Sequence, residues 1–251
     1  GYDMIRFFED IPDKNSNELG FPDSVFILSD ELLVFDHINH TIKVVINAHI
    51  KDNPKLAYKR SKIRIDSIIN SLKKSVRIEP FTAGDTKRFK YPVKSSVSKN
   101  GFIDMVKKAK KYIRDGDIIQ AVLSQRFRLK FKSKPFDIYR ALRSINPSPY
   151  MFYLKYGNLK LIGSSPEIHA RCENRTVQLR PIAGTRPRGK NEEEDLKLEK
   201  ELLKSPKERA EHIMLVDLGR NDIGRVSRPG TVKLSELMVI EKYSHVMHIV
   251  S

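Results

Sequence analysis

The chain has 251 residues and a formal net charge of +16, with 31% charged and 39% hydrophobic residues. This composition is typical of a soluble globular protein, and no run of about 18 apolar residues is present that would span a membrane. The single cysteine, Cys172, excludes an internal disulfide and indicates a reducing, cytoplasmic location. The N-terminus combines acidic and aromatic residues, which is unlike a secretory signal peptide.

The basic residues are spread along the chain. The densest cluster, Lys107–Lys111, falls on a predicted helix whose apolar stripe turns these lysines toward solvent. No aromatic–basic RNA-binding signature is present. We therefore expect no specific nucleic-acid binding, and we expect the positive field to favour a small dicarboxylate.

The first 50 residues are predicted to form strands and turns. Ser24–Ser29 and Glu31–Phe35 flank Asp30 as a predicted hairpin, and Thr41–Ile46 is a third predicted strand. The segment Pro54–Leu72 has the apolar spacing of an amphipathic helix.

The next segment, residues 81–100, has no periodicity and is the predicted linker. Gly101–Arg114 is a predicted helix that Gly116 ends. Apolar and polar residues alternate along Asp117–Phe131, which predicts a strand with Gln120 on its polar face. That polar face either lines a site or faces solvent.

A short helix is predicted at Pro135–Ile145, before a proline-rich turn. A charged run at Asn191–Glu194 opens another helix that leads to Ser205. Short strands of a meander are predicted at Tyr150–Leu154, Leu159–Ile162, Ile168–Cys172 and Thr176–Leu179.

The stretch Ser205–Arg225 carries two carboxylates near the start of a predicted helix. Ser205 is a good N-cap, Pro206 suits the first helical position, and Glu208 completes a capping box. Glu208 and Glu211 share one face, and the residues that follow are apolar on nearly every side, so we expect a buried helix. The carboxylate pair either suits Mg²⁺ or serves the cap and a lysine partner.

Three strings occur in order along the second half of the chain. They are PIAGTRPRG at Pro181–Gly189, KERAEHIMLVDLGRND at Lys207–Asp222 and YSHVMH at Tyr243–His248. With these strings the sequence resembles the chorismate-utilising enzymes, most closely the large subunit (component I) of anthranilate synthase. The resemblance is continuous over residues 101–251 and weaker over residues 1–80.

The resemblance implies an α+β fold of antiparallel β-sheets with helices packed outside. Residues 1–80 would be the C-terminal part of an N-terminal regulatory region, 81–100 a linker, and 101–251 the first half of the chorismate-binding catalytic domain. Family large subunits are about twice as long. The resemblance therefore implies that further substrate contacts and a second Mg²⁺ glutamate pair follow Ser251, and that these 251 residues alone are inactive.

The resemblance also assigns residues to the substrate. Glu167, in the string GSSPE, is implied as a general acid or base near the leaving hydroxyl of chorismate. Gly184 and Thr185 are implied to contact the carboxylate side of the substrate. Ala183 stands where many aminodeoxychorismate synthases have an attacking lysine, and Gln120 where water-adding relatives have a basic lysine. Both residues favour direct addition of ammonia.

A proton-transfer group and a metal site are implied in the same way. His248 stands at the position of the family's active-site histidine, although without that context a lone histidine is more often a satisfied core residue. Glu211, supported by Glu208, is implied to hold Mg²⁺ beside the ring carboxylate. There the metal would anchor the substrate and stabilise the charge that develops as the hydroxyl leaves.

The string NPSPYMFYL, residues 146–154, resembles part of the tryptophan feedback pocket of anthranilate synthases. A proline-rich turn that merely starts a core strand is the alternative, and the family's serine-containing pocket motif is absent from this chain. The candidate tryptophan-binding residues are Asn146, Pro147, Ser148, Tyr150 and Met151.

The function implied is a Mg²⁺-dependent lyase that makes anthranilate and pyruvate from chorismate and ammonia in tryptophan biosynthesis. Its partners would be a glutamine amidotransferase subunit, which supplies ammonia, and tryptophan as feedback inhibitor. The alternatives are aminodeoxychorismate synthase, isochorismate synthase or a non-catalytic tryptophan-binding regulatory module. A basic nucleic-acid-binding protein is a third class, and we expect neither nucleic acid nor a membrane as a partner.

Overall fold

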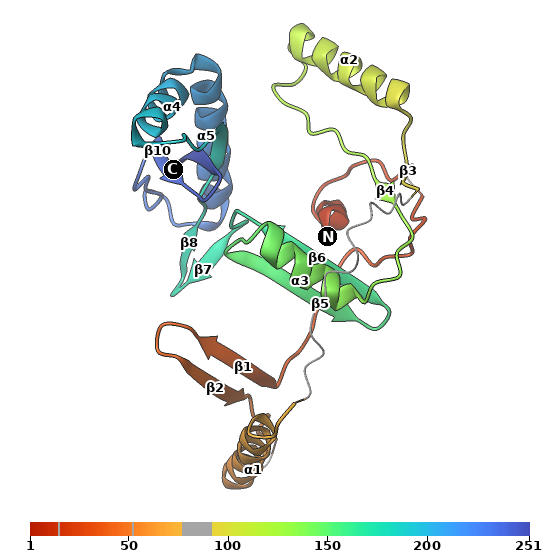
Figure 1. Ribbon diagram of the computed structural model, residues 1–251, viewed down its shortest axis with the longest axis vertical. Coiled ribbons are helices and arrows are strands. Elements are labelled where there is room, and N and C mark those ends of the chain that lie inside the picture. Colours follow the sequence, from red (N-terminus) through yellow and green to blue (C-terminus); the bar gives the residue numbers. More distant parts are fainter. Residues whose placement is uncertain (15, 52, 77–91) are drawn as a thin grey trace. The chain divides into compact units, whose positions relative to one another are not determined.

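The computed structural model describes residues 1–14, 16–51, 53–76 and 92–251 (Figure 1). The chain divides into two compact units, Gly1–Thr82 and Ala83–Ser251. More than half of the predicted linker, residues 81–100, lies outside the described residues. None of the helices in the described part is long and apolar enough to cross a membrane.

The first unit consists of a short 3₁₀-helix, a β-hairpin and one long helix. The 3₁₀-helix spans Tyr2–Phe7, and β1 (Glu31–Asp36) pairs antiparallel with β2 (Thr41–Ile46). The helix α1 (Pro54–Leu72) has the predicted bounds and packs against β2. Its start follows from local chemistry, because the side chain of Asn53 accepts hydrogen bonds from the first free amides of the helix.

The predicted hairpin around Asp30 is wrong, because residues 24–29 form no strand and β1 pairs with β2 instead. The turn between the two strands is set by Asp36. Its carboxylate accepts hydrogen bonds from the backbone amides of Ile38 (3.2 Å) and Asn39 (3.0 Å). Hydrogen bonds from the side chain and the amide of Asn39, with one from Lys43, lower the pKa of Asp36 to about 2.

The second unit begins with a two-residue strand, β3 (Lys94–Ser95), and the helix α2 (Lys99–Asp115). As predicted, Gly116 ends this helix, with a φ of 84° in the left-handed region. The predicted strand at 117–131 is wrong except for β4 (Phe127–Arg128), which pairs with β3. A segment with alternating apolar and polar residues forms a strand only where a neighbouring strand pairs with it. Here the neighbour β3 has only two residues.

The helix α3 (Pro135–Ile145) has the predicted bounds. It packs on the hairpin of β5 (Tyr150–Tyr156) and β6 (Leu159–Ser165) (Figure 1). Phe152 and Gly163 face each other across this hairpin, and the ring of Phe152 occupies the place of a Cβ at Gly163. The glycine is therefore needed for ring packing.

The predicted meander resolves into two separate hairpins. The strands β7 (Arg171–Glu173) and β8 (Thr176–Gln178) pair with each other and not with β6. Asn174 and Arg175, with φ of 49° and 61°, form the two-residue turn between them. Cys172 lies on β7 and is exposed, which agrees with its prediction as a strand residue.

A three-stranded antiparallel sheet with two helices forms the remainder of this unit. Its strand order is β10 (Val239–Lys242), β11 (Val246–Val250), β9 (Ile182–Pro187), and α4 (Glu192–Lys204) and α5 (Pro206–Val226) pack against β9. The core between the layers consists of Leu202, Met247 and Ile249, with Leu198, Met238 and Ile240 packed around them.

The start of α5 differs from its prediction in one respect. Ser205 caps the helix by accepting from the amide of Glu208 at 3.4 Å, but the capping box is not closed, because the Ser205 amide donates to Leu202 O at 3.3 Å. The prediction of a buried helix is wrong for this chain: only His212 and Val216 of α5 are buried.

Candidate active site

His248 lies on the central strand of the three-stranded sheet. On β11 it stands opposite Glu241 of β10 on one side and Thr185 of β9 on the other. Its Nδ1 atom is 3.0 Å from Gly184 O and 3.1 Å from Thr185 Oγ1. A carbonyl oxygen only accepts hydrogen bonds, so Nδ1 carries the hydrogen and Nε2 is the basic nitrogen of the neutral ring.

Tyr243 packs edge-on against the His248 ring, with 5.6 Å between the ring centroids. Its hydroxyl donates to Glu241 Oε2 at 2.7 Å, and Glu241 forms an ion pair with Arg180. The hydrogen bond to Glu241 raises the pKa of Tyr243 to about 12, so the phenol is protonated at neutral pH. Sequence reasoning did not select Tyr243, although it is the first letter of the string YSHVMH that pointed to His248.

The backbone at Gly184 lies against the first turn of α5. This glycine has a φ of 64°, and a Cβ there would lie 3.0 Å from Leu202 Cδ1 and 3.2 Å from Glu208 Oε2. Both the left-handed conformation and the close approach favour glycine. The preceding Ala183 is 7% exposed and pairs with Ile249, so its side chain belongs to the core.

The two carboxylates of α5 each contact a residue from another part of the fold. Glu208 Oε1 lies 3.6 Å from Arg186 Nη1 on β9. Glu211 Oε1 accepts from Gln120 Nε2 at 3.2 Å, across 91 residues of sequence. The structure thus brings together the candidates predicted on four separate strings: Gln120, Ala183, Gly184, Thr185, Glu208, Glu211 and His248.

This donor set fits a hard divalent cation that also has other ligands. Within the described part of the chain, Glu208 and Glu211 make the contacts above through Oε1. The Oε2 atom of each carboxylate is therefore left to bind a cation. No cluster of three or more histidine, cysteine, aspartate or glutamate side chains in that part could hold a metal ion by itself. Two carboxylates suit Mg²⁺, which usually keeps several waters and takes further ligands from substrate.

Glu167 and the candidate tryptophan-binding residues form a second group, on the β5–β6 hairpin. Asn146 O accepts from Ser164 Oγ at 2.8 Å, and the hydroxyl of Ser148 donates to Ser165 O. Tyr150 and Met151 stand opposite Ser165 and Ser164, while Pro147 lies in the turn before β5. Glu167 is exposed in the turn after β6, and no hydrogen bond or ion pair between described residues joins it to His248.

A partly buried ion pair fixes the segment that follows β9. Arg188 Nε donates to both oxygens of Asp195, at 3.1 and 2.9 Å, and its Nη1 donates to Tyr243 O at 2.7 Å. The guanidinium group, together with the amide of Gly189, lowers the pKa of Asp195 to about 2. The pair ties α4 to the loop that carries Tyr243, beside His248.

Comparison with known proteins identifies the family. Residues 1–251 match the model of a family described as chorismate binding enzyme. The chain belongs to the chorismate-binding enzyme family. The resemblance predicted from the three strings is thereby confirmed.

Several curated relatives of the chain are named anthranilate synthase component 1. The chain is 50% identical to anthranilate synthase component 1 of Acetivibrio thermocellus, over 100% of this chain and 51% of that protein. It is 48% identical to anthranilate synthase component 1 of Aquifex aeolicus, over 100% of this chain and 50% of that protein. The chain thus spans about half the length of the curated relatives that it matches.

Solved structures confirm the predicted α+β class. Anthranilate synthase component I from Streptococcus pneumoniae matches with a TM-score of 0.84 and 35% identity, over 100% of this chain and 55% of that one. A putative 2,3-dihydroxybenzoate-specific isochorismate synthase from Bacillus anthracis shares the fold, with a TM-score of 0.52 and 23% identity over 70% of this chain and 46% of that one.

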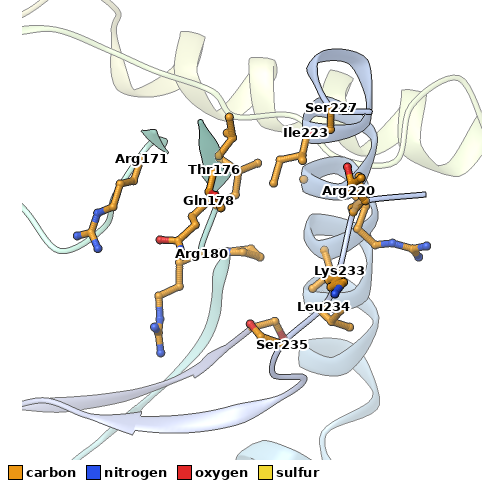
Figure 2. Close-up of a pocket in the computed structure, with 18 of the residues that line it drawn as sticks. Arg171, Thr176, Gln178, Arg180, Arg220, Ile223, Ser227, Lys233, Leu234 and Ser235 are labelled. Carbon is orange, nitrogen blue, oxygen red and sulfur yellow. The ribbon is translucent and has the colours of Figure 1, made fainter. Parts of the chain in front are cut away.

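The second unit also contains a cavity of about 810 Å³, along the C-terminal half of α5. Figure 2 shows its two walls, with Thr176 and Gln178 of β8 across from Ile223 of α5. Residues 227–228 and 231–236 and Ser251 also contribute to the lining. None of the candidate site residues lines this cavity, so the chemistry predicted from the sequence lies elsewhere.

Proposed function

We propose that this chain is the chorismate-converting part of an anthranilate synthase, a lyase that forms anthranilate and pyruvate from chorismate and ammonia in tryptophan biosynthesis. The observation that carries the proposal is the meeting of Glu208, which shares one face of α5 with Glu211, with Gly184, Thr185 and His248 where β9 approaches α5. The identity of 50% to an anthranilate synthase component 1 over the whole chain supports it. Because the chain spans about half of that relative, the activity is proposed for the protein at its full natural length.

His248 is suited to accept a proton through Nε2. Gly184 O holds Nδ1–H at 3.0 Å, which orients the ring and keeps Nε2 unprotonated in the neutral state. In the proposed reaction ammonia forms a C–N bond as the ring hydroxyl leaves as water. A base then removes a ring proton as the C–O bond to the enolpyruvyl group breaks, and the departing enolpyruvate takes up a proton at its methylene carbon to become pyruvate. His248 is the proposed base.

Glu211 and Glu208 are the proposed ligands of a Mg²⁺ ion. Bound there, the metal would neutralise the substrate carboxylate and stabilise negative charge on the departing hydroxyl. The chain itself contributes by keeping basic side chains from forming close ion pairs with the two carboxylates, since such pairs would compete with the metal. Arg186 is directed to Glu201 at 3.0 Å and lies 3.6 Å from Glu208, so it balances charge at the site without a tight contact to Glu208.

Ammonia is the proposed nucleophile because the chain offers no amine where sister enzymes use one. Ala183 is a buried core residue, and Gln120 donates to Glu211 and cannot remove a proton from water. We infer that a glutamine amidotransferase subunit supplies the ammonia. The single Cys172 is exposed on β7 and supports a reducing, cytoplasmic location.

We further propose Glu167 as a general acid or base and part of a tryptophan feedback site at Asn146, Pro147, Ser148, Tyr150 and Met151. The strings GSSPE and NPSPYMFYL support these assignments, and Ser164 and Ser165 of β6 contact Asn146, Ser148 and Glu167. Residues 1–80 are the proposed regulatory region, and 101–251 the first half of the catalytic domain.

The test uses the full-length protein with chorismate, Mg²⁺ and ammonium, with anthranilate detected by fluorescence and all products identified by mass. Wild-type protein is expected to make anthranilate, and Glu211→Gln to reduce the rate at least 100-fold. Glu193→Gln is the matched control, because Glu193 is exposed in the first turn of α4. Aminodeoxychorismate or isochorismate as product would instead assign the chain to a sister enzyme.

A further inference from the structure

His212 is a fully buried ionisable residue directly after Glu211. It is 0% exposed, and its Nε2 lies 2.6 Å from Ser251 Oγ. Its Nδ1 is buried with no hydrogen-bond partner among the described residues. An unsatisfied buried polar atom is costly, so an apolar side chain would serve packing better at this place. The histidine therefore requires a reason other than packing.

Ser251 connects His212 to three strands of the sheet at once. It follows the end of β11, its Oγ accepts from the Met238 amide at 3.0 Å at the start of β10, and its own amide donates to Pro181 O at 3.3 Å just before β9. Met238 has a φ of 56°, a left-handed conformation that is unfavourable for a residue with a side chain. The hydroxyl of Ser251 thus stabilises a strained start of β10 and contacts α5 in the same place.

The position of His212 on α5 determines what this contact controls. Glu208 lies four residues before it, on the same face one turn away, and Glu211 is its immediate neighbour. A helical side chain ends about 5–6 Å from the helix axis, so a roll of about 20° would move a carboxylate by about 2 Å. A functional constellation tolerates only about 0.5 Å.

We propose that His212 is a positioning residue, and that its hydrogen bond to Ser251 fixes the roll of α5 so that Glu208 and Glu211 face Gly184 and the proposed Mg²⁺. This inference rests on the proposed function. It adds a role for a residue that contacts neither substrate nor metal. The bond joins the helix with the carboxylates to the sheet with His248, through the end of the same strand, β11.

Substitutions at position 212 distinguish the effect of the lost hydrogen bond from the effect of a changed side-chain volume. The Nε2 atom of His212→Gln reaches about as far as the imidazole Nε2, whereas His212→Leu fills the space without a polar atom. Val216→Ala is the matched control: it lies one turn further along α5, is 5% exposed, and loses packing but no hydrogen bond. Mg²⁺ affinity of the full-length protein with bound chorismate is measured by calorimetry, and unfolding temperature by melting.

We expect His212→Leu to weaken Mg²⁺ binding about 10-fold or more, as loss of a supporting contact at a metal site usually does, and His212→Gln to restore most of it. Val216→Ala is expected to lower the unfolding temperature with unchanged Mg²⁺ affinity. Ser251→Ala in the His212→Leu background should lower the unfolding temperature further, because the Met238 amide loses its acceptor, but it should weaken Mg²⁺ binding no further, because the bond to His212 is already lost.

Wild-type affinity in His212→Leu, with a lowered unfolding temperature, would overturn the proposal and leave a packing role. The metal site itself is tested separately by Glu211→Gln. If Glu211→Gln abolishes Mg²⁺ binding and His212→Leu does not, only the positioning role fails. If the wild-type protein binds no Mg²⁺, both the metal site and the positioning role are refuted.

Discussion

A Cβ atom at Gly184 would lie 3.2 Å from Oε2 of Glu208, because the backbone of β9 meets the first turn of α5 at this glycine. Because Gly184 has no side chain, the string PIAGTRPRG lies close to the start of the string KERAEHIMLVDLGRND. The contact also explains why Glu208 does not complete its capping box, since its carboxylate is directed at β9 and Arg186.

Gly184→Ala is therefore expected to affect both stability and activity. The left-handed φ of 64° costs an L-residue about 1 kcal/mol, and the added methyl group displaces Glu208. Denaturant unfolding should show a loss of more than about 1 kcal/mol, and anthranilate formation should fall at least 10-fold.

Gly157→Ala separates the two effects. This glycine has a φ of 54°, with nothing within 4 Å of an added Cβ. The variant should lose only the conformational part of the stability and keep its activity. Equal activity losses in the two variants would contradict the assigned contact with Glu208.

The hydrogen on His248 Nδ1 is a second testable consequence of the geometry. Nitrogen-15 NMR of the neutral protein should show a protonated Nδ1 and an unprotonated Nε2, because Gly184 O lies 3.0 Å from Nδ1. Thr185→Val should keep this tautomer, since the carbonyl contact belongs to the backbone. A protonated Nε2 in the wild-type protein would exclude the role of base proposed for that atom.

Helix bounds were predictable where the chain supplies its own caps. For α1 the sequence carries Asn before Pro54, and for α3 it carries a proline at the first position and an Asn-Pro pair at the end. The failures at residues 24–29 and 117–131 have the opposite cause. An alternating pattern fits a strand, but the strand forms only where a partner pairs with it, and pairing is not local information.

The exposure of α5 has a related cause. Leu218 is 53% exposed although its neighbours in sequence predict a buried helix. The apolar pattern of α5 thus exceeds what these 251 residues bury. The strings supplied the candidate site residues, which stay predictions, whereas contacts such as that of Gln120 with Glu211 could not be predicted from them.

Asp195 gives a prediction for acid stability. Its pKa is lowered from 3.8 to about 2 by Arg188 first and by the Gly189 amide. A lowered pKa in the folded state gives stability that is present above pH 3.8 and is lost as pH falls toward about 2. Asp195→Asn should therefore unfold at a lower temperature than wild type at neutral pH, and the difference should shrink across that acid window.

Asp104→Asn is the control for this experiment, because the Asp104 side chain is 72% exposed on α2 and pairs with Lys107 three residues on. It should leave the unfolding temperature nearly unchanged at every pH. A difference between Asp195→Asn and wild type that stays constant down to pH 2 would contradict the assigned ion pair.

Tyr243 provides the corresponding prediction at alkaline pH. The hydrogen bond to Glu241 raises its pKa from 10.0 to about 12, so the folded protein retains a proton that the unfolded chain releases. Stability from this bond is fully present below pH 10 and is lost as pH rises toward about 12. Tyr243→Phe should remove the last-titrating part of the phenolate absorbance curve.

Eight other tyrosines contribute to that curve, so Tyr58→Phe serves as the control variant. Tyr58 lies on α1 and is 73% exposed. Both variants lose one phenolate in total, but only Tyr243→Phe should lose the latest one. Since Tyr243 packs 5.6 Å from His248, the same variant should keep the ring contact and most of the activity. Loss of activity equal to that of Tyr243→Ala would show that the bond to Glu241, and not the ring, orients His248.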